Sequence, residues 1–515
     1  MIAKIISGAL NGIDGIIVTV EVDMCGGIPG IDIVGLPDSA IKESKERVRT
    51  ALRNSGFTVP SRRITVNLAP ANTRKEGAAF DLPIAVGILA CMGVIDYKEI
   101  ENYFMIGELS LDGLLKPVNG VLSLVHCAFK NNIKKIILSD DNSNEASLIE
   151  QLDVFGVDNL KNLVDFLNNK KNIEKTKFNI EKNYDENILN NNNNKFELDF
   201  CDVRGQESAK RAIEIAAAGN HNLLMIGPPG SGKTMIAKRL PNILSKLTFE
   251  ESIDVTKIYS ISGLLKNKNI LIDDRPFRSP HHTISYSALT GGGRIPKPGE
   301  ISLSHKGILF LDELPEFQND VLEILRQPLE DKTITISRVN ATVTYPADFM
   351  LVASMNPCPC GYFGSGIKCN CKVHEISRYI NKISGPLLDR IDIQIEVSNV
   401  DYNDLSSNKK SISTSEIKKR VLKAQKIQKD RYSNIRLNFN SQLNCSQTEA
   451  FCILDKESKN ILKQAFKNLN LSARAYDKIL KISRTIADLD ESKKILFSHV
   501  AEAIQYRTLD RKYWK

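Results

Sequence analysis

The chain has 515 residues, of which 42% are hydrophobic and 25% charged, and its formal net charge is +8 at pH 7. This length exceeds what one hydrophobic core serves and predicts roughly two to four domains, and the composition is typical of a soluble globular protein. Because no run of about 18 apolar residues is uninterrupted, we expect no membrane-spanning helix. The small excess of basic residues is as compatible with a solvated basic surface as with a nucleic-acid partner.

Residues 1–172 predict a separate α/β domain, because strand and helix patterns mix throughout. Apolar alternation indicates strands, at 15–22, 31–36, 64–68 and 134–138. Helical spacing predicts helices, at 38–54 and 79–92, and a mostly helical segment at 148–167. Residues 173–197 contain an asparagine-rich stretch that cannot bury enough apolar surface to offset chain entropy, so we interpret them as a linker.

A glycine-rich motif at residues 227–234 organises the second part of the chain. It reads G-x-x-x-x-G-K-T between an apolar run suited to a buried strand and a segment suited to the start of a helix, which is the context of a phosphate-binding loop. In such a loop, backbone N–H groups bind phosphate oxygens, Lys233 reaches the β- and γ-phosphates, and the Thr234 hydroxyl binds Mg²⁺. The predicted ATP-binding residues are Gly227, Pro228, Pro229, Gly230, Ser231, Gly232, Lys233 and Thr234.

Two later apolar runs end in polar residues. The run at 307–314 leads into Asp312 and Glu313, as expected for a buried parallel strand that presents carboxylates at its C-terminal edge. Asp312 is predicted to hold Mg²⁺ directly or through water, and Glu313 to polarise the attacking water. Asn356 ends the next buried run and is predicted to hold that water against the γ-phosphate.

The order of these three motifs resembles that of the AAA+ ATPases, and it assigns residues 198–395 to an ATPase core and 396–515 to a helical lid. The resemblance implies an arginine that reaches the γ-phosphate bound by a neighbouring subunit and stabilises charge in the transition state. Arg390, in the segment 384–392, matches that arginine, and a pairing with a nearby aspartate is the alternative. Arg474 matches the second sensing arginine of the lid.

Two insertions indicate which group of AAA+ ATPases the chain resembles. Residues 275–299 are rich in proline and glycine, which excludes a simple helix, and residues 333–345 alternate with period two and predict a β-hairpin. Both resemble the helix-2 insert and pre-sensor hairpin of the AAA+ clade that contains magnesium chelatase and the MCM helicases. The resemblance makes Arg338, Arg294 and Lys297 candidate contacts to DNA phosphates, with solvated hairpin tips as the alternative.

The first domain resembles the proteolytic domain of Lon-type proteases, whose fold is of the ribosomal-protein-S5 domain-2 type. The matching segments are 68–77, 104–113 and 117–120. Those proteases use a Ser–Lys dyad, and the matching positions hold Ala79 and Leu122. Alanine carries no nucleophilic oxygen and leucine cannot activate one, so we expect no peptidase activity.

Taken together, these segments identify the chain as resembling the YifB/ComM family of magnesium-chelatase-like proteins over nearly its whole length. The resemblance implies a homo-oligomer, expected to be a hexamer, that binds ATP and Mg²⁺ and acts on single-stranded or branched DNA as a branch-migration helicase. The alternative is a chelatase-type or protein-remodelling ATPase with no DNA substrate.

Four of the ten cysteines form two C-x-C pairs, Cys358 with Cys360 and Cys369 with Cys371. Four thiolates can close a tetrahedral structural Zn²⁺ site, and four reduced thiols are the alternative. Clustered cysteines of this kind favour a reducing compartment, and with no signal peptide recognised we expect a cytoplasmic location. We interpret His281 and His282 as loop or interface residues.

Overall fold

A computed structural model describes residues 2–71, 75, 77–176, 198–265, 271–293, 296–338, 341–399, 412–435, 437–469 and 471–514. The chain divides into two compact units. Unit 1 comprises Met1–Asn194 with Phe249–Ile272, and unit 2 comprises Lys195–Thr248 with Asp273–Lys515. Most of the predicted linker, residues 177–197, lies outside the described residues. Within the described ranges, no helix combines the length and apolar character that crossing a membrane requires.

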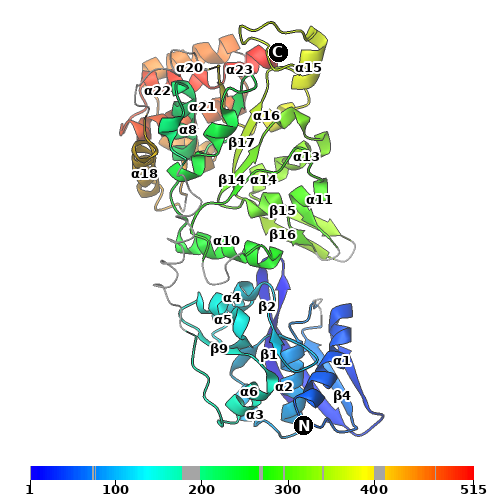
Figure 1. The fold of residues 1–515 in the computed structure, drawn as a ribbon. Helices are drawn as coiled ribbons and strands as arrows, with labels where there is room; N and C mark the ends of the chain where they lie inside the picture. Colours follow the sequence, from blue (N-terminus) through cyan, green and yellow to red (C-terminus); the bar gives the residue numbers. More distant parts are fainter. Residues whose placement is uncertain are drawn as a thin grey trace. The chain divides into compact units, whose positions relative to one another are not determined.

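Unit 1 is built on a seven-stranded mixed sheet (Figure 1). In spatial order its strands are β3 (Gly30–Val34), β4 (Arg63–Ala69), β2 (Asp14–Cys25), β1 (Ile2–Asn11), β5 (Tyr103–Met105), β8 (Lys135–Ser139) and β9 (Asp153–Val157). The β1–β2 and β2–β4 pairs are antiparallel, and the other neighbours run parallel. The helices α1 (Ser39–Asn54) and α2 (Asp81–Cys91) pack against each other, and α2 also covers β1 and β2. This confirms the α/β class.

The prediction that residues 148–167 are mostly helical is wrong for the first half of this segment. It contains β9, which pairs in parallel with β8 and is followed by α6 (Leu160–Leu167). The preceding helix, α5 (Asp140–Ser147), ends before it. A short buried apolar run suits a strand or a helix equally, and here pairing at the sheet edge decides between them.

The helix α10 (Phe249–Ser262) belongs to unit 1, although its sequence lies inside the predicted ATPase core of residues 198–395. It packs on α4 (Val121–Lys130). Ser260 Oγ donates a hydrogen bond to Glu145 Oε1 at 2.5 Å, and the Leu122 N–H donates to the same oxygen at 3.1 Å. The position that matches the protease lysine is therefore a fully buried core residue.

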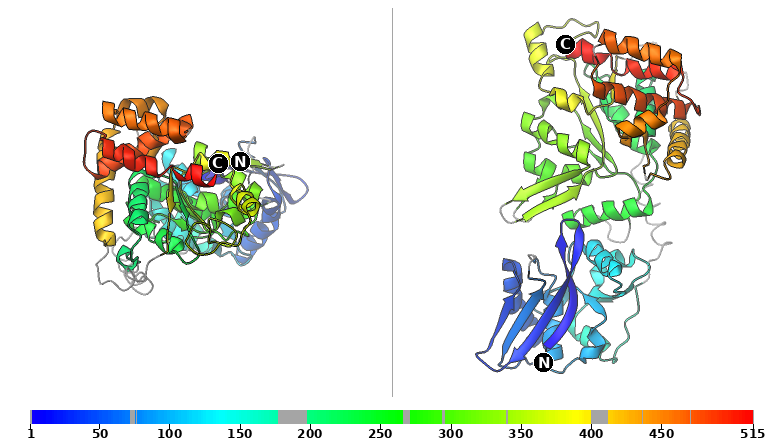
Figure 2. Two further views of the ribbon diagram at one scale, coloured as in Figure 1. Left: turned by 90° about the horizontal axis from the view of Figure 1, so that it is seen from above. Right: turned by 180° about the vertical axis from the view of Figure 1, so that it is seen from behind.

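Unit 2 is built on a five-stranded parallel sheet, which is seen from behind in Figure 2. In spatial order its strands are β11 (Phe277–Arg278), β14 (Ile308–Leu311), β17 (Met350–Met355), β10 (Leu223–Ile226) and β18 (Ile393–Glu396). Each residue of β10, β14 and β17 is buried. Such strands need helices on both faces, and α8 (Glu207–Gly219) contributes to that cover through its contacts with β18.

The two predicted insertions pack together in unit 2. The second is a hairpin of β15 (Thr333–Arg338) and β16 (Ala341–Pro346), which confirms the predicted structure. The first contains α11 (Tyr286–Thr290), β12 (Gly291–Gly292) and β13 (Lys297–Pro298), and α12 (Glu300–Leu303) follows it directly. The buried Tyr345 hydroxyl on the hairpin donates to the Pro296 carbonyl of the first insertion at 2.6 Å.

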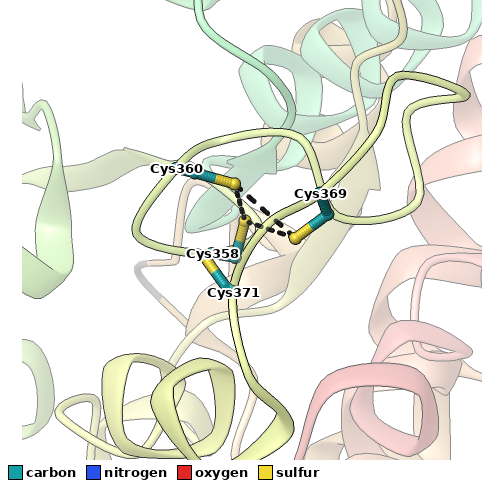
Figure 3. Close-up of side chains that lie close together, drawn as sticks. All are labelled: Cys358, Cys360, Cys369 and Cys371. Atoms are coloured by element: carbon teal, nitrogen blue, oxygen red, sulfur yellow. Dashed lines mark hydrogen bonds between the residues drawn. The ribbon is translucent and has the colours of Figure 1, made fainter.

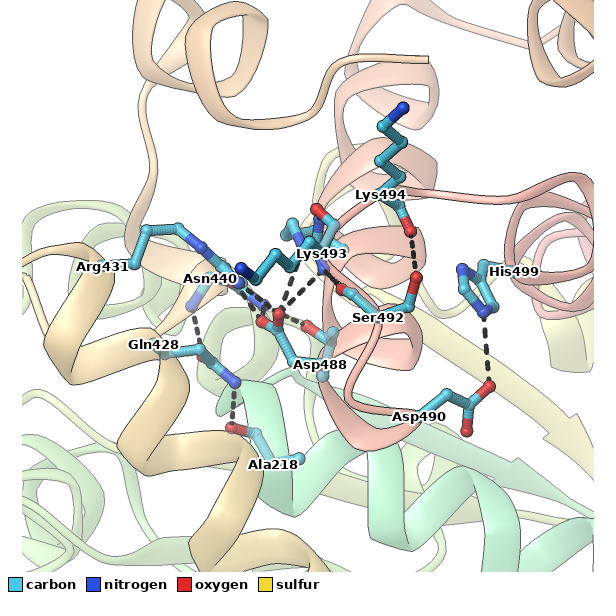
Figure 4. A network of polar contacts seen from close by, with 12 residues as sticks. Ala218, Gln428, Arg431, Asn440, Asp488, Asp490, Ser492, Lys493, Lys494 and His499 are labelled. Atoms are coloured by element: carbon cyan, nitrogen blue, oxygen red, sulfur yellow. Dashed lines mark hydrogen bonds and ion pairs between the residues drawn. The ribbon is translucent and has the colours of Figure 1, made fainter. Parts of the chain in front are cut away.

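The described C-terminal residues are largely helical. Their helices are α18 (Thr414–Arg431), α19 (Cys445–Phe451), α20 (Lys456–Leu469), α21 (Ala473–Leu489), α22 (Phe497–Gln505) and α23 (Leu509–Tyr513). The buried Asp488 carboxylate joins three segments of this part of the chain, because it accepts from Arg431 Nη1 at 2.9 Å, from Asn440 Nδ2 at 2.9 Å and from Arg484 Nε at 3.1 Å (Figure 4). A buried charge that is paired and hydrogen-bonded in this way is costly to disrupt.

Candidate nucleotide site

The predicted phosphate-binding loop connects β10 to α9 (Lys233–Ala237). Gly230 and Gly232 have φ of +78° and +89°, the left-handed region that glycine adopts without strain. A Cβ atom at Gly227 would lie 2.2 Å from the Val397 carbonyl oxygen, so only glycine fits there. The loop backbone therefore passes close to the residue that follows β18, and the loop leads directly into the N-terminus of α9, where backbone N–H groups can bind phosphate.

Lys233 is 8% exposed, and its ammonium group lies inside this loop. Its Nζ donates to the carbonyl oxygens of Gly227 at 2.7 Å and Pro228 at 2.8 Å, and it lies 3.4 Å from Asn356 Oδ1. Burial lowers the pKa of Lys233, and the nearby carboxylates of Asp312 and Glu313 oppose that shift. Lys233 and Asn356 thus meet beyond the carboxyl ends of the neighbouring strands β10 and β17.

Thr234 and Asp312 are in direct contact. Thr234 Oγ1 donates to Asp312 Oδ2 at 2.7 Å, and Ser354 on β17 donates through its hydroxyl to Asp312 Oδ1. The residues of β14 and β17 pair in parallel up to Leu311 and Ala353, which places these side chains at one edge of the sheet. A hydroxyl beside a carboxylate is a donor set that suits Mg²⁺, so the residues present fit the predicted metal.

Glu313 follows Asp312 in an unusual backbone conformation. Its φ is +56°, which a residue with a side chain adopts at a cost and which often marks a functional position. Its N–H donates to Asp312 Oδ1 at 3.1 Å, and its side chain is 51% exposed. The Nδ1 atom of His282 lies 3.5 Å from Glu313 Oε2.

The two predicted arginines differ in their surroundings. Arg390 is 10% exposed, forms an ion pair with Glu330 at the end of α14 (Arg326–Asp331), and donates to the Pro386 carbonyl. The sequence suggested a nearby aspartate as the alternative partner of Arg390, and its ion pair in the structure is with Glu330 instead. Arg474 is 61% exposed and lies 3.7 Å from Asp389. Arg474 is therefore accessible from solvent, whereas Arg390 is held within its own chain.

Two of the three predicted DNA contacts lie on strands of the insertions. Arg338 ends β15 opposite Ala341, and Lys297 lies on β13 with an exposed side chain. Arg294 lies outside the described residues. The hydrogen bond from Tyr345 to Pro296 joins the two insertions. Lys297, the residue after Pro296, is therefore close in sequence to the point where the hairpin is attached.

The four clustered cysteines converge, as Figure 3 shows. Their Sγ atoms all lie within 4.8 Å of one another. The separations are 3.3 Å between Cys358 and Cys360, 3.8 Å between Cys358 and Cys369, and 3.6 Å between Cys360 and Cys369. A disulfide needs about 2.0 Å, whereas four sulfurs around a tetrahedral Zn²⁺ with bonds of about 2.3 Å lie about 3.8 Å apart. The four sulfur atoms are thus close enough together to bind one metal ion.

Two residues at the site escaped the sequence analysis. Ser354, which holds the Asp312 carboxylate, lies within a continuous apolar strand, and its single hydroxyl there was the only available signal. His282 was interpreted as a loop or interface residue, and its contact with Glu313 joins positions 31 residues apart in the chain. No local spacing rule predicts such a contact.

Three family models match the chain. They are described as "Subunit ChlI of Mg-chelatase" over residues 20–142, "Magnesium chelatase, subunit ChlI" over 199–405, and "Magnesium chelatase, subunit ChlI C-terminal" over 411–507. The central match contains the phosphate-binding loop, Asp312, Glu313 and the cysteine cluster. Unit 2 therefore carries an AAA+ core of the magnesium-chelatase type.

Individual relatives agree with these models. The "Magnesium-chelatase 67 kDa subunit" of Chlorobaculum parvum is 25% identical over 162 residues, which are 31% of this chain and 23% of that protein. The "Competence protein ComM" of Haemophilus influenzae is 43% identical over 513 residues, and YifB of Escherichia coli is 41% identical over 504 residues. These two alignments cover 99% and 98% of this chain, and 98% and 96% of the respective relatives. The chain therefore belongs to the YifB/ComM family of magnesium-chelatase-like AAA+ proteins.

Proposed function

We propose that this chain hydrolyses ATP as a ring of identical subunits, with six as the expected number, and uses the energy to move on or remodel DNA as a ComM-like branch-migration helicase. The observation that carries the hydrolase part is the 2.7 Å contact of Thr234 with Asp312 beside the buried Lys233. These groups match what phosphoryl transfer needs, which is charge neutralisation and positioning.

Each residue then has a role. Bound Mg²⁺ would neutralise charge on the β- and γ-phosphates, and Thr234 and Asp312 would hold it. Lys233 exchanges its carbonyl partners for phosphate oxygens, Glu313 polarises the attacking water, and Asn356 orients that water. Backbone N–H groups of the loop would bind the remaining phosphate oxygens.

A neighbouring subunit completes the site in this proposal. Arg390 would leave Glu330 on assembly and supply positive charge to the γ-phosphate bound next to it. Arg474 on the lid is the second sensing arginine, and its 61% exposure supports contact with a ligand or a neighbour.

The DNA part of the proposal is supported by the family and by the joined insertions. The relative named a competence protein is aligned over nearly the full length of both chains. Arg338, Arg294 and Lys297 would hold the phosphate backbone electrostatically, without regard to sequence. The alternative is a magnesium-chelatase-like or protein-remodelling ATPase without a DNA substrate, and the similarity to the Chlorobaculum parvum chelatase subunit favours that reading over about a third of the chain.

One experiment separates these functions. ATP turnover is measured without DNA, with single-stranded DNA and with a four-way junction, at two salt concentrations, and in parallel with the Glu313→Gln variant. We expect stimulation by DNA that weakens with salt, junction movement in the presence of ATP, and no turnover by the variant. Turnover that no DNA changes, together with an immobile junction, would support the DNA-free alternative.

We also propose that Cys358, Cys360, Cys369 and Cys371 hold a structural Zn²⁺ in a cytoplasmic protein. The Sγ separations of 3.3 to 3.8 Å among Cys358, Cys360 and Cys369, with Cys371 Sγ within 4.8 Å of the others, support four thiolate ligands. The Phe363 N–H also donates to Cys358 Sγ at 3.3 Å, a contact that stabilises a thiolate. Four protein ligands leave no open position, so this metal would be structural and not catalytic.

A further inference from the structure

The cysteine cluster lies against the predicted phosphate-binding loop. Gly361, the residue after Cys360, is buried, and a Cβ atom there would lie 2.5 Å from Pro229 Cδ and 2.7 Å from Pro229 Cγ. The backbone of the cysteine segment therefore touches the proline ring within the G-x-x-x-x-G-K-T motif. Pro229 itself is exposed, so Gly361 contacts the loop at a part that the core of the fold does not enclose.

The cluster is also continuous with the other wall of the nucleotide site. Asn356 follows β17, and its Oδ1 atom lies 3.4 Å from Lys233 Nζ. Cys358 is only two residues farther along the chain, is fully buried, and accepts from the Gly361 N–H through its carbonyl oxygen at 2.9 Å. One tight turn thus connects the residue predicted to orient the attacking water, the first of the four cysteines and the contact with Pro229.

The segment between the two cysteine pairs is conformationally costly to order. Gly361, Gly364 and Gly366 have φ of +88°, +74° and +78°, and residues 363, 364 and 366–368 are exposed. Glycine loses more conformational freedom on ordering than any other residue. A metal ion bound by all four cysteines would join both ends of this segment and offset that loss. Metal binding and the position of Gly361 are therefore linked.

We propose that the four cysteines, when bound to Zn²⁺, hold the phosphate-binding loop in the conformation that binds ATP, through the contact of Gly361 with Pro229. The affinity for nucleotide then depends on metal occupancy, and bound nucleotide tightens the metal by the same factor. This inference rests on the proposed function, because it requires a loop that binds ATP. It gives the metal a role at the nucleotide site in addition to ordering its own segment.

The first test compares the full-length chain with and without Zn²⁺. The metal is removed with a chelator under reducing conditions, the chelator is dialysed away, and Mg²⁺ is restored before a fluorescent non-hydrolysable ATP analogue is titrated. We expect the affinity to fall about tenfold without Zn²⁺, a typical coupling between two sites, and to recover with one equivalent of Zn²⁺ but not with extra Mg²⁺. A chromogenic chelator should in turn compete for Zn²⁺ about tenfold less well when the ATP analogue is bound.

The second test keeps the metal and changes the contact. Gly361→Ala retains all four cysteines and places a methyl group 2.5 Å from Pro229 Cδ. Gly366→Ala is the matched control, because both glycines have positive φ, whereas a Cβ at Gly366 meets nothing within 4 Å. We expect both variants to retain Zn²⁺, and only Gly361→Ala to lower nucleotide affinity, by at least about fivefold. In a Pro229→Ala background, which lacks the two ring atoms that clash, Gly361→Ala should lower the affinity much less.

Each result decides for or against the inference. Equal nucleotide affinities of the zinc-loaded and the folded zinc-free chain, or equal effects of Gly361→Ala and Gly366→Ala, overturn it and leave the proposed function intact. A chain that takes up no Zn²⁺ overturns it as well. If circular dichroism shows that the zinc-free chain does not fold, the two alanine variants decide alone. A zinc-loaded chain that binds no ATP analogue overturns the proposed function instead.

Discussion

Thr234 on α9 and Asp312 after β14 meet at 2.7 Å, although 78 residues separate them in the chain. Asp312 is also bound by Ser354 and by the Glu313 N–H. The carboxylate is therefore fixed before any ligand arrives, and fixed groups stabilise a transition state without reorganising.

Replacing Asp312 tests its role in holding Mg²⁺. Asp312→Asn keeps the size of the side chain and removes its charge, so we expect turnover to fall about 100-fold or more and the Mg²⁺ concentration for half-maximal rate to rise. Turnover is measured in a Mg²⁺ titration. Asp331→Asn, at an exposed position, is the control and should match the natural protein. An unchanged Mg²⁺ dependence in Asp312→Asn would show that this carboxylate does not hold the metal.

The close approach of the phosphate-binding loop to the end of β18 leads to a prediction about nucleotide affinity. In Gly227→Ala, the new Cβ would lie 2.2 Å from the Val397 carbonyl oxygen, so the loop must shift and nucleotide affinity should fall at least about tenfold. Gly385→Ala is the matched control, because a Cβ there meets nothing within 4 Å. Titration with a fluorescent ATP analogue compares the two. Equal affinities would mean that the loop does not need this approach to bind nucleotide.

The cysteine cluster predicts a measurable metal content. The purified chain should contain about one Zn²⁺, and Cys358→Ser or Cys369→Ser should lower that content and the melting temperature, since structural zinc contributes to folding. Cys201→Ser, at an exposed cysteine outside the cluster, should retain the metal. Elemental analysis reports the content, and Co²⁺ substitution should give thiolate charge-transfer absorption. A metal-free chain with the same melting temperature would indicate four reduced thiols.

The surroundings of Asp392 lead to a prediction of how the free energy of unfolding depends on pH. Burial alone would raise the pKa of Asp392, but Lys478, at 2.9 Å, and His221 hold that pKa well below its usual range. A lowered carboxyl pKa stabilises the fold at pH values above the unfolded pKa of about 4, and this contribution is lost as pH falls below that value.

The corresponding variant is Asp392→Asn, which leaves Lys478 buried without its charged partner. We expect it to lower the free energy of unfolding by about 3 kcal/mol at pH 7, and this difference from the natural protein should shrink as pH falls through about 4. Urea unfolding of both proteins at several pH values measures this difference in the free energy of unfolding. Glu491→Gln, at a side chain that is 55% exposed, is the control and should change stability little. A difference that does not vary with pH would exclude the ion pair as its cause.

The sequence alone determined the elements whose signals are local. Glycines at fixed spacing between a strand and a helix defined the loop at 227–234, and continuous apolar runs before Asp312 and Asn356 defined two buried strands. Alternating residues on either side of 339–340 defined the hairpin. These patterns are short and depend on backbone geometry or burial that neighbouring residues share, so they can be read without knowing the rest of the fold.

Only the tertiary structure decided where distant segments meet. It placed α10 with unit 1, because Ser260 and Ile253 find their partners there and not beside the strands that flank them in sequence. It made residues 153–157 a strand through pairing with β8. It paired Arg390 with Glu330, and it brought His282 to Glu313. Each of these contacts is set by packing between segments far apart in the chain, and local sequence patterns carry no information about that packing.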